Sequence, residues 1–211
     1  MGITERKERE KEQRRNDILN AAEAVFFKKG IDFSSMDEVA EKAELSKGTL
    51  YLYFKSKEDI RFAVFQRGAG ILNKLMQQNI QVDQSGKDQL ISLGNTFITF
   101  SLQHTDYFKL FIEIQTSNME NLNIGKDAFE NYIKNQSPIT IVQRCVIKGM
   151  KDGSIRNDIP ESHMTATLWS QMLGVMAVIN NHQHLFDIFD IKVDDILRTH
   201  LEIAQHGAIP R

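Results

Sequence analysis

The sequence predicts an all-α protein, in which an N-terminal three-helix domain precedes a larger helical domain. Only three prolines occur in 211 residues. No Asn-Gly or Asp-Gly pair lies between alternating apolar and polar residues, so β-hairpins have no support. Charge also divides the chain, because 25 of the first 60 residues are charged, against 29 of the other 151. We therefore expect a mostly solvated domain over residues 1–60 and a core-rich domain over residues 61–211.

The smaller domain shows helix starts and stops in order. Its first helix repeats apolar residues with a period of about 3.6 and ends at Gly30, which readily takes a left-handed conformation. Serines suit the N-caps of the next three helices, and the first of them forms a capping box with Glu38. These caps are Ser35, Ser46 and Ser56. Two short helices joined by a turn over about residues 36–55 have the layout of a helix-turn-helix.

The larger domain shows further helical periodicity. We expect helices over 86–104, 106–117, 125–151, 161–182 and 191–206. Residues 163–186 contain no Asp, Glu, Lys or Arg, but they include three histidines and several other polar side chains. A membrane-spanning helix should be more apolar, so this segment predicts a helix buried in a core or a subunit interface.

The helix-turn-helix also has the charge distribution of a DNA-binding surface. No acidic residue occurs from Leu45 to Lys57, whereas three lysines do. Helix N-termini expose amides that suit phosphate oxygens, and Gly48 would let DNA approach the backbone. The net charge of −2 therefore excludes only indiscriminate polyanion binding. The candidate DNA-binding residues are Ser35, Ser46, Lys47, Gly48, Thr49, Tyr51, Tyr53, Lys55 and Lys57.

Over about residues 13–65 the chain resembles the DNA-binding domain of the TetR/AcrR family of bacterial transcriptional regulators. The resemblance is carried by Ser35-Met36-Asp37-Glu38-Val39-Ala40, Leu45-Ser46-Lys47-Gly48-Thr49-Leu50-Tyr51, Tyr53-Phe54 and Ser56-Lys57-Glu58-Asp59-Ile60. It implies groove contacts from Lys47, Gly48, Thr49 and Tyr51, and backbone contacts from Ser35, Tyr53 and Lys57. The alternatives are helix packing for the two tyrosines and a merely solvated side chain for Lys55.

Two residues depart from the family pattern. Glu44 lies in the turn, where the family commonly has glycine, and a positive φ there would cause strain. Leu52 lies in the recognition helix at a position that is often polar or aromatic, where it could contact a thymine methyl group.

The larger domain shows no catalytic motif and no helical metal motif among its histidines, so we expect no enzyme activity, cofactor or metal. Cys145 lies on an apolar face, which indicates a small buried side chain rather than a nucleophile. Aromatic residues instead indicate either core packing or an apolar cavity with polar anchors, and the resemblance implies a small hydrophobic or amphipathic effector there. The candidate pocket residues are Phe97, Phe100, His104, Tyr107, Phe108, Phe111, Gln115, Phe129, Tyr132, Trp169, Met172 and Met176.

The resemblance implies a homodimer formed by helices near 161–182 and 191–206, where Gly174 and Ala177 would permit close approach. We therefore expect a cytoplasmic regulator with no membrane contact, most simply a ligand-released repressor that binds a palindromic double-stranded DNA operator. One alternative is a TetR-like DNA-binding protein without a small-molecule inducer. Another is a helical ligand carrier or enzyme, against which the acid-free segment from Leu45 to Lys57 argues.

Overall fold

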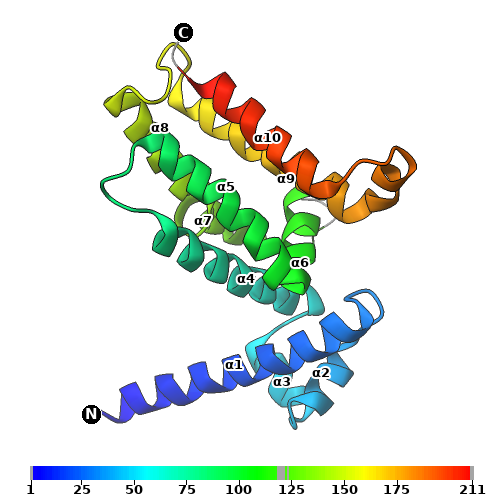
Figure 1. Ribbon diagram of the computed structural model, residues 1–211. Helices are drawn as coiled ribbons and strands as arrows, with labels where there is room; N and C mark the ends of the chain where they lie inside the picture. The colour runs from blue at the N-terminus through cyan, green and yellow to red at the C-terminus, as the bar shows by residue number, and fades with distance from the viewer. Residues whose placement is uncertain (1, 118–121, 123, 210–211) are drawn as a thin grey trace. The chain divides into compact units, whose positions relative to one another are not determined.

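The computed structural model describes residues 2–117, 122 and 124–209, and the regular structure of these residues is entirely helical (Figure 1). This result confirms the predicted all-α fold. Backbone contacts divide the chain into two compact units, the first of which extends to Arg67 and the second of which begins at Gly68. Among the described residues, no helix is both long enough and apolar enough to cross a membrane.

The first unit consists of three helices and the first turns of a fourth. These helices are α1 (Ile3–Lys29), α2 (Met36–Lys42), α3 (Lys47–Tyr53) and α4 (Lys57–Asn79), and α4 continues into the second unit. The side chains that fill the core of this unit are Ile18, Ala22, Phe26, Val39, Leu50, Phe54 and Ile60. Burial of this apolar surface is what holds helices as short as α2 and α3, because isolated helices of this length are unstable in water.

The predicted caps begin these helices. The Ser35 hydroxyl accepts a hydrogen bond from the amide of Glu38, whose carboxylate accepts one from the Ser35 amide, so the capping box is confirmed. Ser46 caps α3, and the Ser56 hydroxyl accepts a hydrogen bond from the Asp59 amide in the first turn of α4.

The first helix extends further toward the N-terminus than its apolar period indicates. Apolar periodicity is evident only from Ile18 onward, but α1 begins at Ile3. The added residues are mostly strong helix formers, and Arg6 and Glu10 form an ion pair one turn apart with an N–O distance of 2.8 Å. Local propensity and charge pairing therefore extend the helix where no core is available.

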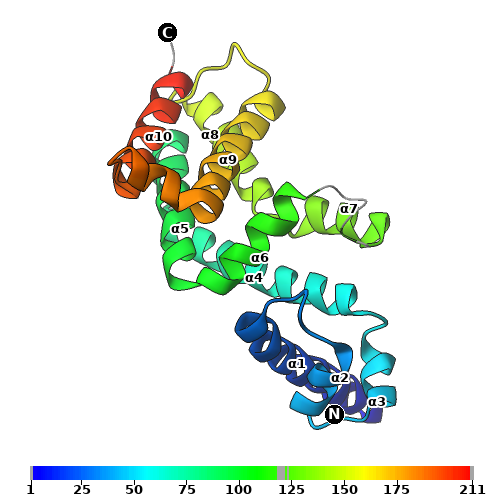
Figure 2. The same ribbon diagram turned by 90° about the vertical axis from the view of Figure 1, so that its right-hand side faces the viewer.

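The second unit packs the remaining helices around an aromatic core. They are α5 (Gly86–Gln103), α6 (Thr105–Thr116), α7 (Lys126–Asn135), α8 (Ile139–Asp152), α9 (Glu161–Ile188) and α10 (Val193–Ala208). Phe97 lies at the centre of the core, with its ring centroid 5.8 Å from that of Phe108 and 6.1 Å from that of Trp169. Helices α9 and α10 lie side by side in both views of the ribbon (Figures 1 and 2).

One predicted helix in this unit was wrong, and another ends at a kink. The single helix expected over 125–151 is two helices, α7 and α8, separated by Gln136, Ser137 and Pro138. A proline disfavours helical backbone at the preceding residue, which explains the break. The helix expected over 161–182 is interrupted at its predicted end by non-helical backbone at His182 (φ −137°, ψ 35°), and helical structure then resumes and continues to Ile188.

Candidate nucleic-acid interface and ligand cavity

The third helix has one buried side and one open side. Leu50 is fully buried, and Phe54 at the C-terminal end of the helix is buried too. These two side chains anchor α3 in the core of the first unit. On the other side, Lys47 and Gly48 are exposed, as are 42% of Tyr51 and 81% of Leu52. A buried anchor and a polar open face are the features a recognition helix needs to enter a major groove.

Hydrogen bonds fix the start of α3. The Ser46 hydroxyl accepts a hydrogen bond from the Thr49 amide at 3.1 Å, and the two hydroxyl oxygens lie 2.8 Å apart. Gly48 faces open space, because a Cβ built there would have the Ser46 hydroxyl, 3.9 Å away, as its nearest neighbour. The protein itself would therefore accept a side chain at position 48.

The turn before α3 contains a residue in the left-handed region. Glu44 has φ 56°, and the following amide, that of Leu45, donates to the Ala40 carbonyl at 2.9 Å. A side chain in this conformation costs about 1–2 kcal/mol relative to glycine. The strain anticipated from the sequence at Glu44 is therefore present.

Lys47 and Asp37 form an ion pair between the first turns of α3 and α2. The Lys47 ammonium lies 2.7 Å from a carboxylate oxygen of Asp37, and this hydrogen bond raises the pKa of Lys47. Both side chains remain more than half exposed. Exposed ion pairs contribute little free energy, so a DNA phosphate or base edge can replace the Asp37 carboxylate at small cost.

The Lys57 ammonium, for which a phosphate contact is predicted, has partners within the protein. The Lys57 ammonium donates to the carbonyls of Ile31 (2.9 Å), Asp32 (3.4 Å) and Ser34 (3.1 Å). An ammonium group has three donors, and three acceptors occupy them here. Lys57 therefore fastens the loop between α1 and α2 to the start of α4. The position of Lys57 just after the recognition helix suggested a DNA contact and did not indicate this structural role.

The remaining DNA-binding candidates differ in exposure and in hydrogen bonding. Lys55 is exposed, whereas Tyr53 is half-buried and its carbonyl accepts a hydrogen bond from Arg15 at 3.4 Å. Ser35 is exposed, but its hydroxyl lies in the capping box. The Lys29 ammonium binds the Glu38 carboxylate and is the main cause of the lowered pKa of Glu38.

The second unit contains an apolar cavity of about 90 Å³. Three predicted pocket residues line it: Phe97, Trp169 and Met172. The other lining residues are Met76, Lys87, Leu90, Ile91, Leu93, Gly94, Val142, Leu168, His200, Leu201, Ala204, Gln205 and Ala208. Helix α10 contributes five of these, and the prediction missed them because it started from the aromatic residues and took no residue from this helix. The i, i+4 spacing of the apolar residues of α10 is the signal that indicates this face.

The structure does not bring the other nine predicted pocket residues to this cavity. Five are buried in packing between helices: Phe100, Phe108, Phe111, Tyr132 and Met176. Four are partly exposed elsewhere in the unit: His104, Tyr107, Gln115 and Phe129. Of the two alternatives weighed for the aromatic cluster, core packing therefore describes most of its members.

The polar groups at the cavity are few. Lys87 supplies a cation, Gln205 an amide, and His200 an imidazole whose pKa is lowered by burial. Cys145 is buried outside the cavity, and burial raises the pKa of its thiol to about 11, so the thiolate form is scarce at neutral pH. Among the described residues, no group of three or more His, Cys, Asp or Glu side chains could hold a metal ion.

Comparison with known proteins gives one matching family model. Residues 18–64 match the model described as "Bacterial regulatory proteins, tetR family". The fatty acid metabolism regulator protein of Bacillus subtilis is 25% identical over 143 residues, which cover 67% of this chain and 71% of the relative. The transcriptional activator FasR of Mycolicibacterium smegmatis is 30% identical over 103 residues, which cover 49% of this chain and 47% of the relative.

Solved structures share the fold over nearly the whole chain. The repressor FadR of Thermus thermophilus, a TetR-family protein in complex with lauroyl-CoA, matches with a TM-score of 0.68 and 16% identity. The match covers 93% of this chain and 96% of that one.

Proposed function

Because the chain belongs to the TetR family and is a DNA-binding transcriptional regulator, we propose that it is a ligand-released repressor that acts as a homodimer on a palindromic operator. The observation that carries this proposal is the open face of α3, which combines exposed Lys47, Gly48 and Tyr51 with a buried anchor at Leu50. This face suits the major groove. We place the protein in the cytoplasm, because a bacterial regulator acts where the DNA lies.

The proposed contacts to DNA divide into two kinds. Lys47, released from Asp37, reaches a base edge, while Thr49 and Tyr51 supply hydroxyl groups and Gly48 allows close approach. Lys55 contacts the phosphate backbone together with the exposed cap at Ser35 and with Tyr53. The exposed Leu52 side chain meets a thymine methyl group, which makes hydrophobic contact part of the base recognition.

The proposed effector has a hydrocarbon chain and an acidic or strongly polar head. The cavity is almost entirely apolar, but Lys87 and His200 offer charge and hydrogen bonds at its wall. Two relatives support this chemistry, since one is a fatty acid metabolism regulator and one was solved with lauroyl-CoA. A fatty acid or fatty acyl thioester therefore matches the chemistry of the cavity lining best.

The small volume of the cavity provides a way for effector binding to change DNA binding. At about 90 Å³ it is smaller than sites for drug-sized ligands, which have about 300–1,000 Å³. Binding of an acyl chain therefore requires the helices around the cavity to separate. Helix α4 includes both Met76, which lines the cavity, and Lys57, which holds the loop before α2, so we propose that α4 transmits this movement.

The proposed dimer interface uses α9 and α10. The exposed face of α9 is uncharged and includes Thr167, Ser170, Gly174 and Val178 at helical spacing. A Cβ built on Gly174 meets no atom within 4 Å, so this face is open to a partner, and on α10 the Ile203 side chain is 64% exposed. A dyad would place two recognition helices in successive major grooves about 34 Å apart.

The function is tested by selecting binding sites from a random duplex library with the full-length chain. We expect enrichment of a palindrome whose half-site centres are separated by about one helical turn, with affinity that falls steeply with salt. A ligand carrier or enzyme with an incidental helix-turn-helix would enrich no sequence.

The effector is tested by titrating saturated fatty acids and acyl-CoAs of increasing length into the protein–operator complex. Trp169 is the only tryptophan and lines the cavity, so its fluorescence reports occupancy directly. We expect a fluorescence change and DNA release over the same concentration range. Release without a change at Trp169 would place the effector elsewhere, and neither response would favour a regulator without a small-molecule inducer.

A further inference from the structure

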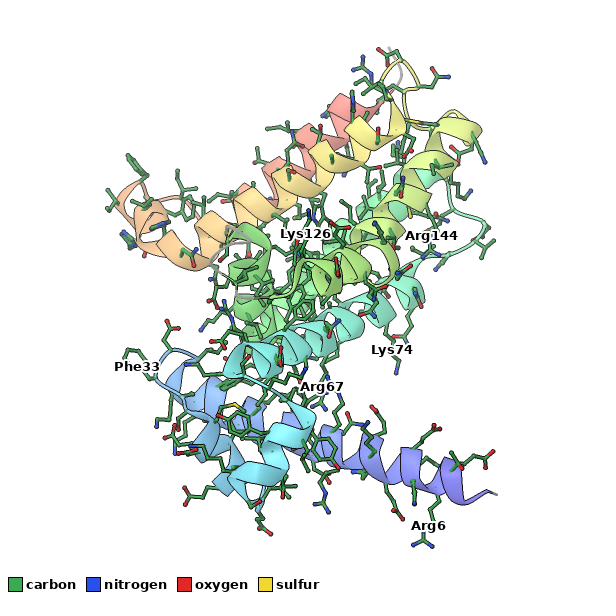
Figure 3. All side chains as sticks on the ribbon, turned by 180° about the vertical axis from the view of Figure 1, so that it is seen from behind. Arg6, Phe33, Arg67, Lys74, Lys126 and Arg144 are labelled. Atoms are coloured by element: carbon green, nitrogen blue, oxygen red, sulfur yellow. The ribbon has the colours of Figure 1, made fainter. Side chains whose placement is uncertain are left out.

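The N-terminal part of α1 is a helix without a core. From Thr4 to Arg14 every side chain is exposed, and this segment spans about 16 Å at 1.5 Å per residue. Figure 3 shows Arg6 in this segment with its side chain in solvent. The segment buries little apolar surface in the first unit, so packing does not explain its charged residues, and these residues are candidates for a binding role.

The charges of this segment are sorted by face. Lys7, Lys11 and Arg14 recur at spacings of four and three residues, which places them in one stripe along the helix. Ile18 continues the same spacing, and it is fully buried in the core of the first unit. Because seven and eleven residues are close to two and three turns, Lys11 and Lys7 lie within about 20° of Ile18 around the axis.

Two contacts show which way the faces of α1 point within the first unit. On one side the Arg67 guanidinium of α4 (Figure 3) donates to Asn16 Oδ1 at 3.0 Å and to Asn20 Oδ1 at 2.7 Å. On another side the Arg15 guanidinium lies 4.2 Å from the ring centroid of Phe54, at the end of the recognition helix.

The stripe lies on the opposite face of α1 from the residues that bind Arg67. Glu12 precedes Asn16 by one turn and lies on the α4 face, and its carboxylate accepts a hydrogen bond from the side-chain amide of Asn16 at 3.5 Å. The stripe instead follows the line of Ile18, which is fully buried and lies about 160° around the helix axis from both Asn16 and Asn20.

The cations of the stripe also differ in pairing from those beside it. Arg6 donates to Glu10 at 2.8 Å, and Arg9 donates to the Glu5 carbonyl at 3.4 Å. Lys7, Lys11 and Arg14 have no hydrogen bond or ion pair to any described residue. Their charges are therefore available to an external anion.

We propose that Lys7, Lys11 and Arg14 bind the phosphate backbone of the DNA that flanks the half-site read by α3. This inference rests on the proposed function. The stripe is about 10 Å long, which corresponds to about three base-pair steps. It supplies affinity without sequence preference, because phosphate contacts carry no base information. An anionic lipid surface is a poorer occupant, since the segment has no apolar face to insert.

The test compares K7Q/K11Q with R6Q/R9Q in the full-length chain. Both variants remove two positive charges from the same three turns, and glutamine preserves helix propensity. The probes are the selected operator and a mixed-sequence 40-base-pair duplex, each measured between 50 and 200 mM salt. Each lost phosphate contact reduces the salt slope by about 0.9, so K7Q/K11Q should lose about 1.8 per protomer, while R6Q/R9Q stays close to wild type.

Over this fourfold change in salt, wild-type affinity should fall about 12-fold more per protomer than that of K7Q/K11Q. The charge-preserving variant K7R/K11R should keep the wild-type slope. Equal slopes for K7Q/K11Q and R6Q/R9Q would overturn the inference, as would binding of the stripe to anionic vesicles with unchanged DNA affinity. Wild type that binds neither duplex would instead remove the proposed function itself.

Discussion

The two units of this protein are stabilised in different ways. In the first, short helices depend on polar groups that fix helix ends and loops, as the capping box at Ser35 and the three carbonyl contacts of Lys57 show. In the second, long helices pack through aromatic side chains and close glycine contacts, and they leave a cavity beside Trp169. A DNA-reading surface needs fixed exposed groups, whereas a ligand-responsive domain needs packing that can open.

The largest effect on stability is expected where two helices of the second unit meet. A Cβ on Gly86 would overlap the backbone of Gly149, because α5 and α8 cross at these two residues. Since backbone cannot move aside as a side chain can, Gly86→Ala should lower the free energy of unfolding by about 3 kcal/mol or more. Chemical denaturation monitored at Trp169 measures this unit directly.

The control for this substitution is Gly70→Ala in α4. A Cβ on Gly70 meets no atom within 4 Å, so the substitution should gain about 0.5–1 kcal/mol of helix propensity. If Gly86→Ala were as stable as Gly70→Ala, the close crossing of α5 and α8 would be disproved.

A second comparison concerns two lysines near the recognition helix. Lys57→Ala leaves three carbonyls without their ammonium donor and should destabilise the first unit by about 2 kcal/mol. Lys55→Ala should change stability by less than about 0.5 kcal/mol, because its side chain is exposed, but it should weaken DNA binding. Thermal unfolding by circular dichroism, combined with DNA titration, separates the two roles. Equal stability of both variants would contradict the structural role of Lys57.

The turn of the helix-turn-helix contains a site where stability can be gained. Glu44 has φ 56°, so Glu44→Gly should relieve strain and stabilise the first unit by about 0.5–1 kcal/mol. Glu41→Gly, three residues earlier within α2, should destabilise by a similar amount because the position is helical. The unfolding midpoints should therefore shift in opposite directions, and a shift of both in the same direction would contradict the backbone assignment of this turn.

The smallest effect is expected from pH in the second unit. The side-chain hydrogen bond from Ser154 and the backbone hydrogen bond from the Gly86 amide hold the pKa of Asp152 at about 2. A lowered pKa in the folded state means that this stabilisation is complete above the unfolded value near 4 and is lost as the pH falls toward 2. In an acid titration of unfolding free energy, Asp152→Asn should show a shallower decline than wild type. Parallel curves would count against this role.

Much of the first unit could be predicted from sequence, because its determinants are local. Cap residues and the turn act over three or four positions, and the acid-free segment is one continuous stretch from Leu45 to Lys57, so a single sequence displays all three. The role of Lys57 could not be predicted, since its acceptors lie 23–26 residues earlier in the chain. Likewise, the sequence does not show which side of α1 before Ile18 lies next to α4 or next to α3. The contacts of α1 with Arg67 and Phe54 identify these sides.

The cavity was less predictable for the same physical reason. Which aromatic side chains line a void and which fill the core depends on how α5, α9 and α10 pack, and packing is not local in sequence. Phe97 and Trp169 line the cavity, whereas Phe100 and Phe111 have the same chemistry but are buried in the packing around it. Pro138 is visible in the sequence and could have predicted the break between α7 and α8. The helical periodicity on both sides of it led instead to the prediction of one helix.

The central claim is that the open face of α3 binds DNA, and Gly48→Ala tests it most directly. The protein has room for the added methyl group, so the variant should fold and gain about 0.5–1 kcal/mol of stability from helix propensity. The same methyl group should obstruct the approach of DNA and reduce operator affinity at least tenfold. A variant that is more stable and binds the selected operator more weakly is the predicted result. A variant that binds the operator as tightly as wild type would contradict the account.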